Sequence, residues 1–160
     1  MSERLCLEHY LNPGELYFGQ GQVRVATLLG SCVAITLWHP KARHGGICHF
    51  VLDSRGGALD SLDGRYADEA VAMFLVELGL RGTRPAEYEV KVFGGANMFT
   101  NDGTDIGNLD VGARNIAAAD RLLASHGFPN AKARHVGGTG HRRLLFELWN
   151  GDVWMRYKRP

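Results

Sequence analysis

The apolar residues of this chain lie in short runs, and most of these runs are joined by turns too short to contain a helix. Such runs span residues 23–29, 32–38 and 46–52; they are rich in valine and isoleucine and bounded by glycine or proline. Parallel strands need a long crossover connection, whereas antiparallel strands do not. The sequence therefore predicts sheets that are largely antiparallel.

Further strands are indicated in the middle and at the end of the chain. Residues 87–93 alternate between polar and apolar side chains, as a half-buried strand does. Residues 144–149 and 153–158 flank the pair Asn150-Gly151, which favours a type I′ hairpin turn because both central positions need a positive φ. The stretch 53–64 is polar and rich in glycine, so we expect a loop there.

Two segments have the periodicity of helices that are apolar on one side. The first spans about residues 66–78, and the second spans residues 111–126, with Asp110 as N-cap and Gly127 as the stop. The residues of the second helix expected to face the core are Ile116, Ala119, Leu122 and Leu123.

The strands at 33–37 and 46–52 are apolar on both faces, so we expect their sheet to be covered on both sides. Two helices cannot cover both faces of two sheets. The predicted fold is therefore α+β: a layered β-sandwich of largely antiparallel sheets with flanking helices, forming one domain over residues 1–160.

Composition excludes several classes of protein. With 18 basic and 17 acidic residues, the net charge of +1 gives no electrostatic reason to expect a nucleic-acid or anionic-membrane partner. No apolar run approaches the roughly 20 residues of a membrane span, and the first residues lack the order of a secretion signal. We expect a cytoplasmic protein whose cysteines, Cys6, Cys32 and Cys48, are free thiols.

The segment around Pro40 is expected to form a hairpin. If its turn spans residues 39–42, Cys32 lies directly opposite His49, with Cβ atoms roughly 4.5–5.5 Å apart. A thiol and an imidazole would then be within hydrogen-bond reach on one face. The other face would hold only apolar side chains: Val33, Ile35, Leu37, Cys48, Phe50 and Leu52.

A paired thiol and imidazole suit nucleophilic catalysis, with Cys32 as nucleophile and His49 as general base and acid. We expect a nearby imidazolium and backbone N–H groups to lower the thiol pKa. The turn at Gly30-Ser31 would aim N–H groups at a developing oxyanion. A third residue should orient the imidazole, and the local candidates are Thr27, Thr36 and Asp53.

Other readings of these residues stay open beside the catalytic one. Cys32 and His49 could be ordinary core residues, and Gly94-Gly95-Ala96-Asn97 could be a simple turn or could line the site with its backbone. A zinc site using Cys48 is disfavoured, because neighbouring residues of a strand point to opposite faces. The glycines at 137–140 lack the spacing of a phosphate-binding loop. We expect no metal and no cofactor.

Two stretches of this chain resemble the signature motifs of the CheD family, the chemoreceptor glutamine deamidases. They are residues 27–34 (TLLGSCVA) and residues 45–52 (GGICHFVL), which hold Cys32 and His49. Further matching stretches follow in the family's order and extend the resemblance over nearly the whole chain: residues 13–15, 65–68, 91–99, 106–107, 112–115, and 137–138 followed by Arg142.

The resemblance implies a cysteine hydrolase that converts receptor glutamines to glutamates and releases ammonia. It assigns Cys32 as nucleophile and His49 as general base and acid, and Thr27 matches the family's third residue. Ser31, Gly94, Gly95 and Asn97 would line the site or hold the oxyanion. The implied fold is a β-sandwich similar to that of toxins that deamidate GTPases. The implied partners are the cytoplasmic domain of chemoreceptors and a CheC-type phosphatase.

Two other functions compete with receptor deamidation. One is a binding module that docks on a receptor or a phosphatase, with catalysis secondary. The other is a different thiol acyl-transfer enzyme, such as a protease or a transglutaminase. A Cys32→Ala variant separates these classes, because it should abolish catalysis and spare binding.

Overall fold

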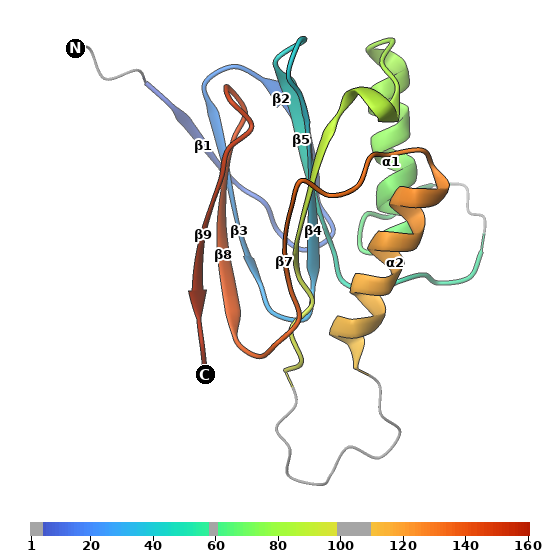
Figure 1. The fold of residues 1–160 in the computed structure, drawn as a ribbon, viewed down its shortest axis with the longest axis vertical. Helices are drawn as coiled ribbons and strands as arrows, with labels where there is room; N and C mark the ends of the chain where they lie inside the picture. Colours follow the sequence, from blue (N-terminus) through green and yellow to red (C-terminus); the bar gives the residue numbers. More distant parts are fainter. Residues whose placement is uncertain (1–4, 58–60, 99–109) are drawn as a thin grey trace, which may run out of the picture.

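Two β-sheets pack face to face in the computed structural model of this chain, and both helices lie on the same side of the pair (Figure 1). The structure describes residues 5–57, 61–98 and 110–160. Phe99, Ile106 and Gly107, which belong to the family-like stretches, lie outside the described residues, as do residues 1–4. The arrangement confirms the predicted β-sandwich of largely antiparallel sheets with flanking helices.

The strands divide between a sheet of four and a sheet of five. The four-stranded sheet has the order β1-β3-β8-β9, with bounds Leu7–Tyr10, Val23–Leu29, His141–Glu147 and Val153–Lys158. The five-stranded sheet has the order β2-β5-β4-β6-β7, with bounds Leu16–Gln20, His44–Phe50, Val33–His39, Glu89–Gly94 and Ala133–Val136.

Only two neighbouring pairs in these sheets, β1–β3 and β6–β7, are parallel. The other pairs are antiparallel. Strands β1, β2 and β7 do not appear among the predicted strands. Each has only four or five residues at the edge of a sheet, and none of these residues is fully buried. The six predicted strands are present with bounds shifted by a few residues.

The helices are α1 (Ala67–Leu80) and α2 (Val111–Ser125), with a short 3₁₀ helix at Pro85–Glu87 between them. The Asp110 carboxylate accepts a hydrogen bond from the Ala113 N–H, which confirms the predicted N-cap. The predicted apolar side of α2 faces the core, with Ala119 and Leu123 buried. Among the described residues, no helix is long and apolar enough to cross a membrane.

Two separate cores hold the layers together. The core between the five-stranded sheet and the helices contains five residues of the predicted apolar face: Val33, Ile35, Leu37, Cys48 and Phe50. Leu52, the sixth residue predicted on that face, is 41% exposed, because β5 ends at Phe50 before reaching it. The core between the two sheets is built by the opposite faces of the same strands together with the inner face of the four-stranded sheet: Leu11, Val25, Leu29, Ala34, Ile47, Phe93, Leu144, Phe146 and Leu148.

The β4–β5 hairpin has a different register from the predicted one. His49 pairs with Ala34, so the prediction that Cys32 lies directly opposite His49 is wrong by two residues. The loop holds four residues, 40–43. The Arg43 N–H donates to the His39 carbonyl at 2.8 Å, and Arg43 has a positive φ of 54°. A shift of two leaves every side chain on its predicted face, because side chains in a strand alternate with a period of two.

The β8–β9 hairpin also departs from its predicted turn. Gly151 has a positive φ of 79°, but Asn150 does not, so the type I′ turn is wrong. Leu148 leaves the strand ladder to enter the core, where it is fully buried and its N–H donates to the Val23 carbonyl at 2.9 Å. The loop between the strands is therefore longer than two residues.

Candidate active site

Thr27 and His49 meet between the two sheets. Thr27 lies on β3 and His49 on β5, both side chains are buried, and Thr27 Oγ1 is 2.7 Å from His49 Nδ1. The Thr27 hydroxyl donates its proton to the Leu11 carbonyl at 2.8 Å, because a carbonyl only accepts. The hydroxyl must therefore accept from His49 Nδ1–H. This contact selects the imidazole tautomer in which Nε2 carries a free lone pair.

Burial keeps the imidazole of His49 uncharged. It lowers the pKa of His49 to about 4, so the ring is neutral at pH 7. Nε2 is buried and has no hydrogen-bond partner among the described residues. A neutral imidazole with a free Nε2 lone pair is the form that a general base requires.

The backbone of His49 is held by the segment that joins β1 to β2. The Gly14 N–H donates to the His49 carbonyl at 2.7 Å, and the His49 N–H donates to the Glu15 carbonyl at 3.3 Å. Gly14 has a φ of 89°, and a Cβ there would lie 2.5 Å from Arg65 Cγ. The stretch at residues 13–15 therefore needs glycine at this position in order to hold the strand that carries His49.

Cys32 lies just before β4 and packs, half-buried, against the core between the sheets. It stands two residues before Ala34, which pairs with His49, so the thiol and the imidazole are on the same side of the hairpin. Side chains in this diagonal relation are roughly 7–8 Å apart between backbones, within reach of a long or cyclic side chain. No hydrogen bond joins Cys32 to His49 in this arrangement of the described residues.

The pKa of the Cys32 thiol is raised by burial, and a hydrogen bond from its own backbone N–H offsets only part of the effect. The expected lowering by an imidazolium is not found, because burial disfavours the charged form of both groups. The free protein therefore holds a neutral thiol beside a neutral imidazole. Cys48 is fully buried in the helix-side core, where burial raises its pKa to about 12.

The segment from Gly94 to Asn97 runs alongside the Cys32 loop and contacts it through the backbone. The Gly95 N–H donates to the Cys32 carbonyl at 2.9 Å, and the Ala96 N–H donates to the Gly30 carbonyl at 3.0 Å. Gly94 has a φ of 109°, and a Cβ there would lie 2.2 Å from the Cys32 carbonyl oxygen. Since the Gly95 N–H already donates to the Cys32 carbonyl, it supports the loop that carries Cys32 and is not free to bind an oxyanion. The Asn97 N–H donates to the Gly138 carbonyl at 2.8 Å.

Asn115 of α2 belongs to the site, although its role was not predicted. Its side chain is fully buried, and Nδ2 donates to the Ser31 carbonyl at 3.1 Å and to the Val51 carbonyl at 2.8 Å. One amide thus joins the residue before Cys32 to the strand end after His49. The available signal was a polar side chain among the apolar positions of a helix, which needs a buried hydrogen-bond partner.

Of the three candidates to orient His49, the structure joins Thr27 to the ring. Thr36 lies in the β4 ladder opposite Ile47. Asp53 forms an ion pair with Arg114 at 3.4 Å. These contacts leave Thr27 as the residue placed to orient the imidazole.

Arg142 closes the same end of the sandwich from the four-stranded sheet. Its guanidinium is buried, with Nε donating to His135 Nδ1 at 2.8 Å and Nη2 donating to the Gly137 carbonyl at 2.7 Å. Because His135 lies on β7 of the other sheet and Gly137 directly follows that strand, Arg142 links the two sheets beside Gly94.

A family model and curated relatives both show that this chain is similar to CheD proteins. Residues 53–157 match the family model described as CheD chemotactic sensory transduction. The chain is 48% identical over 151 residues to a probable chemoreceptor glutamine deamidase CheD 3 of Dechloromonas aromatica (strain RCB), covering 94% of this chain and 87% of that protein. It is 43% identical over 153 residues to a probable chemoreceptor glutamine deamidase CheD of Pseudomonas syringae pv. tomato, covering 96% and 90%.

Among solved structures, the hypothetical protein YfiH of Bacillus licheniformis aligns with 72% of this chain and 47% of its own, at 14% identity and a TM-score of 0.43. A likeness of this degree bears on neither the fold nor the activity.

Proposed function

This chain belongs to the CheD family, and from that premise we propose that it hydrolyses glutamine side chains of chemoreceptors to glutamates, with release of ammonia. The proposal assigns the chemistry to Cys32, His49 and Thr27 within one catalytic domain over residues 1–160. The observation that carries it is the 2.7 Å contact of Thr27 with His49 Nδ1, which leaves Nε2 free on the side of the hairpin that holds Cys32.

In the first step, the Cys32 sulfur attacks the carbon of the glutamine side-chain amide while His49 Nε2 takes the thiol proton. Charge therefore appears only as the carbon–sulfur bond forms, which suits a pair that is neutral at rest. His49 keeps its Nδ1–H on Thr27, so the hydroxyl stabilises the imidazolium as it forms. The Nε2 proton then passes to the amide nitrogen, ammonia leaves, and a thioester remains on Cys32.

In the second step, water attacks the thioester while His49 Nε2 takes one of its protons. The carbon–sulfur bond breaks, the proton returns to the sulfur, and a glutamate side chain is released. One glutamine amide and one water thus become one glutamate and one ammonia, and both catalytic groups return to their neutral forms.

The proposed substrate is the cytoplasmic domain of a chemoreceptor, which sets the expected location of the enzyme in the cytoplasm. A CheC-type phosphatase is a second proposed partner. Co-purification of this chain with such a phosphatase, in the presence and absence of the receptor domain, tests that pairing.

Mass spectrometry of a purified chemoreceptor cytoplasmic fragment tests the proposed reaction. The fragment is incubated with this chain or with its Cys32→Ala variant. We expect glutamine-to-glutamate mass gains at specific sites with the unsubstituted chain alone. Equal gains with Cys32→Ala would overturn the assigned nucleophile, and binding without any gain would favour the binding module. Incorporation of an added primary amine in place of water would indicate a transglutaminase.

A further inference from the structure

No described element covers the outer face of the four-stranded sheet, because both helices pack against the other sheet (Figure 1, left side). Strand alternation turns Leu28 of β3 and Trp154 of β9 toward this side, while their neighbours face the inner core. Leu28 is 49% exposed and Trp154 is 61% exposed. Large apolar side chains gathered on an uncovered sheet face mark an interaction surface.

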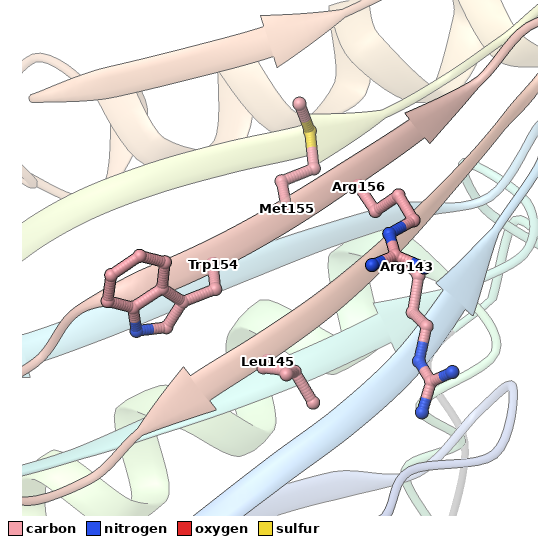
Figure 2. A pocket seen from close by; sticks show the side chains of 5 residues that line it. All are labelled: Arg143, Leu145, Trp154, Met155 and Arg156. Carbon is pink, nitrogen blue, oxygen red and sulfur yellow. The ribbon is translucent and has the colours of Figure 1, made fainter.

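Two arginines face each other on this surface. Arg143 of β8 and Arg156 of β9 are direct partners in the ladder, and Figure 2 shows them side by side. Like charges in this position destabilise a sheet. Neither arginine forms an ion pair within the described part of the chain. The carboxylates on the same face, Glu8 and Glu147, both bind Arg24 instead.

The two arginines line a hollow together with apolar side chains. Its volume is about 310 Å³, and its lining consists of Arg143, Leu145, Trp154, Met155 and Arg156 (Figure 2). Guanidinium groups bind carboxylates through paired hydrogen bonds, and exposed tryptophan and arginine are typical anchors of protein interfaces. The surface therefore fits a segment that carries both carboxylates and apolar side chains.

This surface begins next to the proposed active site in the chain. Leu28 follows Thr27 in the chain and pairs with Arg143 in the ladder. The outer face thus begins one residue from the group that orients His49, at the end of the sheet where the Cys32 loop starts. Leu28 stands four residues before Cys32, so their Cα atoms are at most about 14 Å apart along the chain.

We propose that the outer face, defined by Leu28, Arg143, Leu145, Trp154 and Arg156, binds an acidic amphipathic segment of the substrate protein. Carboxylates of that segment pair with the two arginines, and its apolar side chains cover Leu145 and Trp154. A glutamine of the same substrate then reaches Cys32. This inference rests on the proposed deamidase function. A lipid surface is the weaker occupant, because two arginines give little attraction to a membrane and a lipid brings no glutamine.

The test is a single charge reversal, Arg143→Glu. Opposite Arg156, the new glutamate forms a favourable pair, so the sheet is not weakened by the substitution. We expect the KM for a chemoreceptor cytoplasmic fragment to rise about tenfold while kcat at saturation stays unchanged. The matched control is Arg121→Glu, which reverses an exposed arginine on α2 in the opposite layer and should leave KM unchanged.

A second pair of variants tests the apolar part of the surface. Trp154→Ala should also raise KM, whereas Val76→Ala, which removes an exposed apolar side chain from α1, should not. An unchanged KM for both Arg143→Glu and Trp154→Ala, with the fragment still deamidated, overturns the docking proposal and leaves the function standing.

A direct binding measurement distinguishes failure of the docking proposal from failure of the proposed function. If the unsubstituted chain deamidates nothing, the affinity of Cys32→Ala for the fragment is measured with and without Arg143→Glu. A weaker affinity with the reversal supports the docking surface although the function has failed, and an equal affinity overturns it. Arginine-dependent binding to phosphatidylserine vesicles, with no change in KM for the fragment, assigns the surface to a membrane and also overturns the proposal.

Discussion

The hydroxyl of Thr27 lies 2.7 Å from Nδ1 of His49, although the two residues belong to different sheets. The same hydroxyl donates to the Leu11 carbonyl, so its single proton is committed and the imidazole must be the donor in this contact. The packing of one sheet on the other thus sets the tautomer of the proposed base. Any change that separates the sheets here should act on catalysis as well as on stability.

Replacing Thr27 by valine keeps the side-chain volume and removes the hydroxyl. We expect the deamidation rate to fall at least about tenfold, because His49 loses its orienting partner. Thr27→Ser retains the hydroxyl and should keep most of the activity. Rates on a receptor fragment, measured for variants shown to be folded, check this; equal activity of the valine variant would remove Thr27 from the mechanism.

Cys32 should react as a thiol and not as a preformed thiolate. Burial raises its pKa above the ordinary value of 9.0, so alkylation by iodoacetamide should be slow at neutral pH and should still rise above pH 9. A Cys6→Ser background leaves Cys32 as the reporter, because Cys48 is fully buried with a pKa of about 12. Fast alkylation that is independent of pH between about 6 and 8 would instead indicate an ion pair.

His49 should make the fold less stable in acid. Its pKa falls from 6.5 in the unfolded chain to about 4 in the folded protein, so between these values the unfolded state binds more protons. Stability is fully present above pH 6.5 and is lost as pH falls toward 4, by about 3 kcal/mol. Urea unfolding at several pH values measures this. His49→Asn should have a shallower dependence, and identical slopes would contradict the assignment.

Asn115 should position the catalytic pair through the Ser31 and Val51 carbonyls. In Asn115→Ala both carbonyls lose their donor, so we expect a stability loss of about 1–3 kcal/mol and a lower kcat with little change in KM. Asn115→Asp keeps the shape but turns an oxygen toward the carbonyls, and it should not restore kcat. The matched control is Asn130→Ala at an exposed position. Reduced stability with an unchanged kcat would show that the role is only structural.

Gly94 should tolerate no side chain. An alanine Cβ would lie 2.2 Å from the Cys32 carbonyl oxygen, and the φ of 109° is strained for alanine. We expect Gly94→Ala to destabilise the protein by more than about 2 kcal/mol and to lower activity by displacing the nucleophile loop. Gly57→Ala, which points into open space, serves as the control in denaturant unfolding. Equal stability of the two variants would argue against this close packing.

In the hairpin that carries Cys32 and His49, local sequence patterns predict the buried face but not the register. Alternation along residues 33–37 and 46–52 predicts which side chains face the helices, and the core between sheet and helices contains them up to Phe50. Leu52 lies beyond the end of β5 and is exposed. The predicted register was wrong by two residues. The prediction assumed a two-residue turn, whereas the loop holds four residues and ends at Arg43, which has a left-handed backbone conformation. Nothing in the residue types of 40–43 specifies that conformation.

Contacts between segments far apart in the chain are a second feature that local patterns do not predict. Position in the chain did not separate Thr27, Thr36 and Asp53, and only the resemblance to the family favoured Thr27. The stacking of β3 over β5 brings Thr27 to the ring. Asn115 was missed for the same reason, since its partners Ser31 and Val51 lie more than sixty residues away in the chain.

The sequence alone therefore determined the main strands, both helices, the side of each strand that is buried, and the residue types able to act as nucleophile and base. These are local properties, set by the alternation of side chains along strands and by helical periodicity. Only the tertiary structure decided the hairpin register, the partner and tautomer of His49, and the raised pKa of Cys32. These depend on turn conformation, on contacts between distant segments, and on burial that arises only when the two sheets pack together.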